Sequence, residues 1–413
     1  MNHEQPSSTE KAEEGQERPH IVECDFRNVP ELLRTFEKDP EELGYVLDDP
    51  RVFLERLSGM NHESDSDDSG RSERFQESMR RLERILSHPA TSETLGNGTT
   101  NIFSVPKKNV AGIPDPFSGR VGLRETRQVP IFDRRSGLYY LGIPVNHDQP
   151  DPVGASRQGT MIQAVGSAIK GILPRIYWYT EERGARDMET GQLIPGLENE
   201  VVRTKAVMER LNGPTIAKII DREGIFWKRR YSARKPEEFM DFIRSEEYGE
   251  YIRYSVEQAV QDWPGILDLD WDRLGAIFKD RMRFLNSLSG GASLLFRDGH
   301  FGNVALLFSD RECRIPDPRI IGLMDFDLSA LSMRTDFGSQ LADYLNEAKS
   351  DSLGEQFFMP DHLSPSDESR GPLGKTLTTD AVTHNTAMFE VIREIIMDIR
   401  EKTPADHDPS LVK

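Results

Sequence analysis

The chain has 413 residues, of which 36% are hydrophobic and 8% aromatic, enough to build two packed domains with extensions. Its formal net charge of −18 argues against a nucleic-acid partner, because binding a phosphate backbone needs clustered Lys and Arg. Two cysteines, Cys24 and Cys313, are too few for a disulfide framework, and no run of 18 uncharged apolar residues suggests a membrane span. We therefore expect a cytoplasmic globular protein that binds neither nucleic acid nor membrane.

The first part of the chain predicts a tail followed by helices. Residues 1–20 are rich in Glu, Gln, Ser and Pro and are interpreted as a disordered tail. Residues 21–110 predict several helices, since apolar residues recur at helical spacing and Pro30, Pro40 and Pro50 stand at favourable helix starts. An acidic linker at 64–69 precedes a charged amphipathic helix at 72–87. Short helices of this kind are unstable alone, so we expect them to dock, within the chain or on a second molecule.

A small sheet domain is predicted for residues 111–233. The stretch 92–119 is loop-like throughout, and the new domain begins near Gly112. A hairpin at 129–145, a strand at 175–180, a helix at 196–211 and a second hairpin at 215–233 follow. The order β, β, β, α, β, β indicates a small, mostly antiparallel sheet with one helix.

Residues 234–413 predict a second, mainly helical domain. Helices are expected at 237–263 and 270–290, and a final helix at 380–402. Two strand-like segments interrupt them. The first, at 294–307, reads "LLFRDGHFGNVALL", and the second, at 320–331, reads "IIGLMDFDLSAL".

These two segments place polar side chains between apolar runs. A buried polar group costs about 1–3 kcal/mol unless it is paired, so such side chains usually have a partner or a metal. Asp298 and Asn303 are close enough in sequence to meet at one mouth of a hairpin, and Asp325 would join them if its strand pairs nearby. Carboxylate and amide oxygens suit Mg²⁺, and a further carboxylate can accept a proton from a substrate hydroxyl. This set predicts magnesium-assisted phosphoryl transfer.

The motifs "RDGHFGN" and "MDFD" resemble the catalytic loop and metal-binding segment of the protein-kinase-like fold, in its aminoglycoside phosphotransferase and choline-kinase-like branch. The resemblance implies that Asp298 is the catalytic aspartate and that Asn303 and Asp325 bind the metal. His300 also matches within the loop, and Asp336 matches in the downstream "TDFGSQLADY". It further implies a two-lobed α+β fold, with a small antiparallel sheet lobe (111–233), a larger helical lobe (234–413) and the helical N-terminal region as an extension.

Two positions depart from the pattern of that branch. Phe296 and Arg297 stand where the branch has His-Gly, and Gln340 stands where it has a second aspartate. The missing histidine normally braces the loop, so its loss affects geometry more than chemistry. The resemblance covers about 112–402 and is specific over 294–344.

The nucleotide-binding residues leave several alternatives open. The fold needs a lysine on its third strand, paired with a glutamate on the next helix, to hold the ATP phosphates. Lys170 with Glu200 is one candidate pair, and all such charges could instead be solvated. The segment 153–166, with Gly154 and Gly159, could be the turn that covers the phosphates or an ordinary loop.

The leading hypothesis is an ATP- and Mg²⁺-dependent kinase for a hydroxyl of a small molecule. An aminoglycoside-like or other amino alcohol suits an acidic protein, although the acid could merely solubilise the tails. The alternative is a kinase-like binding protein that has lost transfer, which Phe296 and Gln340 favour and the intact set of Asp298, Asn303 and Asp325 opposes. The sequence leaves the acceptor and the oligomeric state open.

Overall fold

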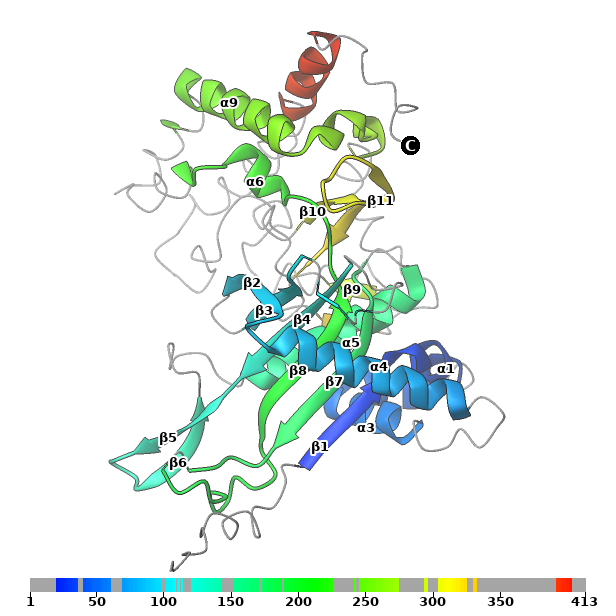
Figure 1. The fold of residues 1–413 in the computed structure, drawn as a ribbon, viewed down its shortest axis with the longest axis vertical. Helices are drawn as coiled ribbons and strands as arrows, with labels where there is room; N and C mark the ends of the chain where they lie inside the picture. The colour runs from blue at the N-terminus through cyan, green and yellow to red at the C-terminus, as the bar shows by residue number, and fades with distance from the viewer. Residues whose placement is uncertain are drawn as a thin grey trace, which may run out of the picture.

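The computed structural model has an α+β fold with an antiparallel sheet of six strands (Figure 1). It describes residues 20–35, 40–60, 69–97, 101–108, 110–111, 113, 120–142, 152–170, 173–187, 189–225, 241–242, 245–274, 293–295, 304–324, 330–332 and 391–402. The α+β class expected from the sequence is therefore confirmed, and so is the antiparallel character of the sheet.

The strands of the central sheet follow the spatial order β1-β7-β8-β4-β3-β2. They are β1 (His20–Asp25), β2 (Ser92–Asn97), β3 (Asn101–Pro106), β4 (Val121–Arg127), β7 (Ile176–Arg183) and β8 (Val201–Glu209). β4 pairs with β8 in the middle of the sheet, from Val121 opposite Glu209 to Arg127 opposite Arg203. Successive side chains of a strand point to opposite faces, so Leu123 and Arg124 of β4 lie on different sides of the sheet.

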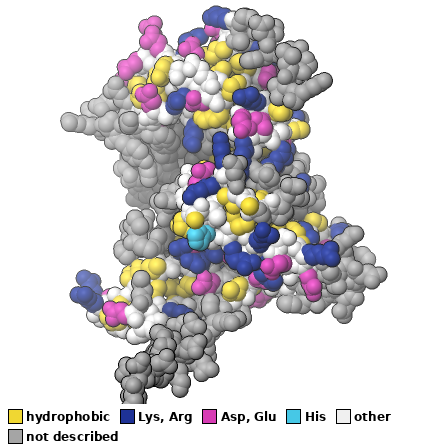
Figure 2. All heavy atoms as spheres, in the orientation of Figure 1, with side chains coloured by type: hydrophobic (Ala, Val, Ile, Leu, Met, Phe, Trp, Pro, Cys, Tyr) yellow, Lys and Arg dark blue, Asp and Glu magenta, His cyan; other side chains and the backbone are white. Residues whose placement is uncertain are grey.

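Helix α4 (Ser69–Ser87) covers one face of the sheet and crosses in front of it in Figure 1. Its apolar side packs on the strands in one buried cluster, formed by Met79, Leu82, Leu86, Val121, Leu123, Trp178 and Val207. Salt bridges lie beside this cluster, such as that from Lys205 Nζ to Glu83 Oε1 at 2.9 Å. The space-filling view of this face shows Lys and Arg side chains gathered across its middle, although the chain as a whole is acidic (Figure 2).

Helix α5 (Pro152–Lys170) packs on the opposite face of the sheet. Helices α1 (Val29–Thr35) and α3 (Pro50–Met60) pack on α5, and α2 (Pro40–Asp48) packs on α3. Phe53 and Leu57 of α3 share one buried cluster with Met161 and Ile162 of α5. A 3-10 turn at Phe26–Asn28 links β1 to α1. Of the two alternatives expected for the N-terminal helices, docking within the chain is therefore the one observed, on α5 and the sheet.

A separate hairpin, β5 (Val129–Asp133) with β6 (Leu138–Gly142), projects from one end of the sheet (Figure 1). The Asp133 carboxylate accepts bonds from the backbone N–H groups of Arg135 and Ser136 and so fixes the turn. Gly137 has φ +70°, which glycine adopts without strain. The hairpin expected at 129–145 is confirmed.

The link that leaves β8 runs beside strand β10 (Val304–Phe308). The backbone N–H of Leu306 donates to Pro214 O, and that of Phe308 donates to Asn212 O, both at 2.9 Å. Gly213, between these two bonded residues, has φ +144°, and a Cβ there would lie 1.8 Å from the carbonyl oxygen of Leu306. Glycine is therefore required where the two parts of the chain meet.

The rest of the described chain contains helices and two small strand pairs. Helix α6 (Ile216–Ile220) packs on α9 (Glu246–Asp262), which is followed by a 3-10 turn at Pro264–Asp268. Strand β10 pairs with β11 (Pro316–Leu323), and β9 (Ser293–Leu295) pairs with β12 (Ala330–Ser332), both antiparallel. A helix at 391–402 contacts α9 through the Arg253–Asp398 ion pair. The helical patterns predicted at 237–263 and 380–402 are confirmed where the structure describes them.

Several predicted elements are wrong. The predicted helix at 196–211 contains strand β8 instead, because its charged side chains find partners, as Lys205 does in Glu83. The segment 153–166 is not a turn or loop but lies inside α5. The predicted loop at 92–119 contains β2 and β3, and the predicted hairpin at 215–233 begins with α6, capped by the side chain of Thr215.

The central sheet also crosses the boundary predicted near residue 110. β1, β2 and β3 come before that point, whereas β4, β7 and β8 come after it. Residues 21–110 thus supply strands as well as helices to the fold. Composition changes at this point of the sequence, but the hydrogen bonds between β3 and β4 join the two parts in one sheet.

Candidate functional site

Two pairs of strand ends frame the segments that carry the predicted catalytic residues. Leu295, the last residue of β9, pairs with Ala330, the first residue of β12. Val304, the first residue of β10, pairs with Leu323, the last residue of β11. The connection from β9 to β10 and the connection from β11 to β12 therefore begin and end at paired positions.

The catalytic and metal-binding candidates belong to these connections or follow them. Asp298, His300 and Asn303 lie between β9 and β10, Asp325 lies between β11 and β12, and Asp336 follows β12. All five lie outside the described residues, so their roles stay predictions.

The predicted nucleotide-binding residues lie in other elements than expected. Gly154 and Gly159 are inside α5, and Lys170 is its last residue. Glu200 is exposed and directly precedes strand β8, where its carbonyl accepts a bond from Gly184 N at 2.9 Å. The predicted glycine turn at Gly159 is wrong, because the backbone there is helical. The lysine was expected on a strand and the glutamate on a helix, but Lys170 ends a helix and Glu200 precedes a strand.

A different basic residue, Arg124, lies on the α5 face of β4. Its Nη2 donates to Thr160 Oγ1 of α5 at 2.5 Å, and the side chain is half-buried. No salt bridge joins it to any carboxylate among the described residues. A partly desolvated guanidinium without a counter-charge favours an anionic ligand, because removing a charge from water is costly unless it is paired.

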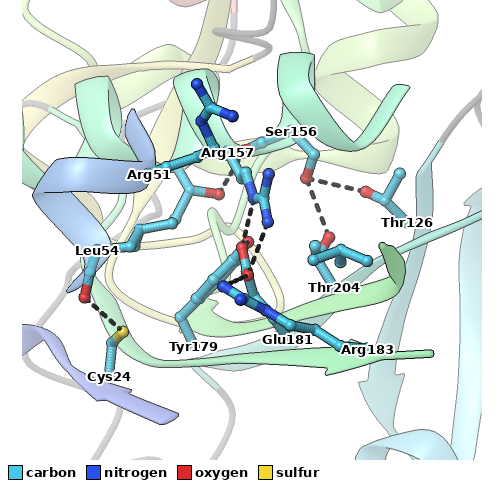
Figure 3. Close-up of polar contacts among 12 residues, drawn as sticks. Cys24, Arg51, Leu54, Thr126, Ser156, Arg157, Tyr179, Glu181, Arg183 and Thr204 are labelled. Carbon is cyan, nitrogen blue, oxygen red and sulfur yellow. Dashed lines mark hydrogen bonds and ion pairs between the residues drawn. The ribbon is translucent and has the colours of Figure 1, made fainter. Parts of the chain in front are cut away.

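Hydroxyl groups connect α5 to the two middle strands beside Arg124. Thr126 Oγ1 of β4 donates to Ser156 Oγ at 2.9 Å, and Ser156 Oγ lies 3.3 Å from Thr204 Oγ1 of β8. Thr160 Oγ1 in turn donates to the carbonyl of Ser156 at 2.6 Å. Ser156, Thr126, Thr204 and Thr160 are all buried, so these bonds satisfy groups that water does not reach. Figure 3 shows the bonds of Ser156 to Thr126 and Thr204.

A buried ion pair ties the same helix to β7. Arg157 Nε and Nη2 donate to the two carboxylate oxygens of Glu181 at 2.5 and 2.8 Å (Figure 3). The hydroxyl of Tyr179 also donates to Glu181, at 2.8 Å, and Arg183 approaches it at 3.4 Å. Burial alone would raise the pKa of Glu181, but the hydrogen bonds and charge of Arg157, together with Tyr179 and Arg183, hold the pKa below its ordinary value.

A second ion pair joins the sheet to the β10–β11 hairpin. Arg319 of β11 donates to both carboxylate oxygens of Glu209, at 2.7 and 3.2 Å, and also to Asp317. Glu209 is the last residue of β8, immediately before the link to α6. The two bonds from the guanidinium of Arg319 to Glu209 therefore hold the β10–β11 hairpin, which precedes Asp325 in sequence, against the end of the central sheet.

The prediction from sequence missed Arg124, Glu181 and Arg157. Arg124 had a readable signal in "VGLRE", where Val121 and Leu123 alternate with Gly122 and Arg124 as in a half-buried strand. Glu181 and Arg157 had no such signal, because nothing in the local sequence shows that residues 24 positions apart form a buried pair.

The described residues contain no group of three or more His, Cys, Asp or Glu side chains that could hold a metal ion. No described helix combines the length and the apolar character that crossing a membrane would require. Comparison with models of known protein families and with curated proteins finds no match to the chain.

Proposed function

We propose that the chain is an ATP- and Mg²⁺-dependent phosphotransferase that acts on a hydroxyl of a small molecule, in a two-lobed protein-kinase-like fold. An aminoglycoside-like or other amino alcohol is the acceptor, since a chain with a net charge of −18 favours cationic ligands. Asp298 orients the hydroxyl and accepts its proton, and Asn303 and Asp325 hold the metal.

The observation that carries this proposal is the pairing of the strand ends around the motif. Leu295 pairs with Ala330 and Val304 pairs with Leu323, so both connecting segments start and finish side by side. Asn303 precedes Val304 directly, and Asp325 follows Leu323 by two residues. Chain connectivity therefore supports a common site for the two predicted metal ligands, because two residues of chain span only about 7 Å.

The order of the sheet elements supports a nucleotide site on the α5 face. In protein kinases, a glycine-rich loop covers the phosphates, a lysine on the third strand contacts them, and a glutamate on the next helix positions that lysine. β2, β3 and β4 are consecutive antiparallel strands, with Gly96 and Gly98 around the β2–β3 connection, and α5 follows the β5–β6 hairpin. Arg124 on β4, bonded to Thr160 of α5, fits this role better than Lys170.

The residues of the chain thus divide the work. Arg124 would neutralise phosphate charge as a planar fork, since a guanidinium offers several donors in fixed directions. The metal supplies charge compensation for the phosphates when it is bound. Asp298 needs only to hold the acceptor hydroxyl and take its proton, which is the role of a general base.

A specific observation favours the second candidate, a kinase-like protein that binds but transfers weakly or not at all. The cation on β4 is an arginine with a neutral threonine partner, where active kinases have a lysine and a glutamate. Phe296 and Gln340 depart from the family pattern as well. A neutral partner orients a cation less strongly than a carboxylate does, which would reduce transfer before it reduced binding.

The test is ATP turnover by the full chain against a panel of amino alcohols and aminoglycosides, with and without Mg²⁺. Asp298→Asn should lower turnover by about 10²–10⁴-fold, the contribution of a positioned general base, and leave ATP affinity within a few-fold. Asp272→Asn is the control, since Asp272 is an exposed aspartate whose side chain bonds Arg393, and it should leave turnover unchanged.

The outcomes separate the two candidates. Turnover that survives Asp298→Asn would rule out the role of that residue. ATP binding with no turnover on any acceptor would select the binding protein instead. A chain that binds no ATP would exclude both.

A further inference from the structure

We propose that the buried ion pair between Arg157 and Glu181 is the positioning contact that sets the orientation of α5 and, through Thr160, the direction of Arg124. The inference rests on the phosphate role given to Arg124 in the proposed function. It assigns a task to Glu181, which lies on β7 and bonds to Arg157, Tyr179 and Arg183 instead of to Arg124.

The contacts of α5 with the sheet are polar as well as apolar. Ser156, Arg157, Thr160 and Gln163 lie at helical spacing on one side of α5, and each bonds to a group outside the helix. Gln163 Nε2, for example, donates to Pro174 O at 2.8 Å, just before β7. Hydrogen bonds are directional, whereas apolar packing tolerates small rotations. This side of α5 therefore fixes one orientation of the helix.

Glu181 provides the negative charge of this interface. Its side chain is 3% exposed, and the side chain of Arg157 is 14% exposed. Arg183 also points to Glu181, with its Nη2 3.4 Å from the carboxylate (Figure 3). Without the Glu181 charge, Arg157 and Arg183 would repel one another in a partly desolvated place.

The helix carries the effect of this ion pair to Arg124. Thr160 follows Arg157 by three residues, so both side chains lie on the same side of a rigid helix turn. Thr160 Oγ1 accepts the only side-chain hydrogen bond recorded for Arg124 among the described residues. A rotation of α5 that broke the fork of Arg157 would move this acceptor and release the guanidinium of Arg124.

A purely stabilising role explains the pair less well. Replacing a buried ion pair by apolar side chains is often neutral or stabilising, so such a pair is weak evidence for stability. Its bidentate geometry supplies direction instead, because two parallel bonds fix the plane of both groups. The α4 face offers a matched comparison, where Glu83 bonds Lys205 and Thr180 on the same two strands, β8 and β7, but has no bond to Arg124.

The experiment measures ATP affinity of the full chain by calorimetry, together with hydrogen exchange of the α5 amides, in four variants. Glu181→Gln should weaken ATP binding about tenfold and speed exchange in α5. Arg157→Lys keeps the charge without the fork and should change both readouts in the same direction by less. Thr160→Val should weaken ATP binding but leave exchange in the rest of α5 slow. Glu83→Gln, the control, should lower the melting temperature and leave ATP affinity and α5 exchange unchanged.

Three results would overturn the inference. The first is a folded Glu181→Gln or Arg157→Lys protein with wild-type ATP affinity. The second is an equal loss of ATP affinity in Glu83→Gln and Glu181→Gln. Both losses would then come from a less stable fold and not from the position of Arg124. The third is a wild-type chain that binds no ATP. This result would contradict the proposed function itself, and it is distinguished from the first two because the wild type also lacks ATP binding.

Discussion

Two helices cover the two faces of one sheet, and their polar contacts with it differ. α4 inserts Met79, Leu82 and Leu86 into an apolar cluster, with its salt bridges beside that cluster. α5 also packs on the same strands through apolar residues such as Met161 and Val165, and adds hydroxyl groups, an amide and a buried ion pair. Apolar contact stabilises without specifying direction, whereas a satisfied polar interface specifies one arrangement. The additional directional bonds of α5 are consistent with the proposal that this face positions a site.

The largest effect that the comparison predicts is a loss of stability on the α4 face. Leu82 is fully buried in its cluster. Leu82→Ala should lower the free energy of unfolding by about 2–5 kcal/mol, through lost burial and the cavity left behind. Denaturant melts check the stability, and calorimetry of the folded variant should give wild-type ATP affinity. A Leu82→Ala protein that folds but no longer binds ATP would contradict the prediction that substitutions on the α4 face affect stability but not ATP binding.

The next effect falls on the α5 face and concerns binding. Arg124→Ala should weaken ATP binding by about 10–100-fold, the worth of a hydrogen bond to a charged group, and change stability much less than Leu82→Ala does. Arg124→Lys should recover part of the affinity, because it restores the charge without the planar fork. The measurement is calorimetric titration with ATP and Mg²⁺.

The control for Arg124 is Arg81→Ala, an exposed arginine on α4. It removes the same charge from the opposite face and should leave ATP affinity unchanged. Equal losses in Arg124→Ala and Arg81→Ala would mean that only the net charge of the chain matters, and the site would have to lie elsewhere.

The smallest effect is a difference in pH dependence between the two faces. The pKa of Glu181 is lowered from 4.5 in the folded chain, so its charge stabilises the fold above about that pH, and the stabilisation is lost as the pH falls through the folded pKa. The stability difference between wild type and Glu181→Gln should therefore shrink as the pH drops below 4.5. Urea melts at several pH values measure it. The stability difference between wild type and Leu82→Ala should not change with pH, since neither leucine nor alanine titrates. The prediction is contradicted if the two stability differences, for Glu181→Gln and for Leu82→Ala, show the same dependence on pH.

The sequence predicted the elements whose pattern is local. The β5–β6 hairpin follows from alternation around an Arg-Ser-Gly turn, and β7 follows from the aromatic and β-branched run at 175–180. α4 follows from apolar residues at helical spacing, with Met79, Leu82 and Leu86 on one side. These elements needed no knowledge of their partners.

The elements that the sequence did not predict depend on partners far away in the chain. β8 carries Arg203 and Lys205, which look helical or exposed until Glu125 and Glu83 are placed beside them. α5 contains small residues and glycines typical of a loop, but they permit close packing, since a Cβ on Gly166 would lie 2.3 Å from Leu173 Cδ1. Asp298, Asn303 and Asp325 could be predicted because they belong to short local motifs. Glu181 could not be predicted, because its partner Arg157 lies 24 positions away in the chain.

The proposed function requires that the paired strand ends bring the two predicted metal ligands, Asn303 and Asp325, to one ATP site. The most direct measurement is the affinity for ATP, with and without Mg²⁺, of the wild type, Asp325→Ala and Asn303→Ala. We expect Mg²⁺-dependent binding in the wild type, its loss in Asp325→Ala and a smaller loss in Asn303→Ala, because a carboxylate offsets the charge of the cation and an amide does not. Wild-type affinity in both variants, or ATP binding that does not respond to Mg²⁺, would contradict the claim.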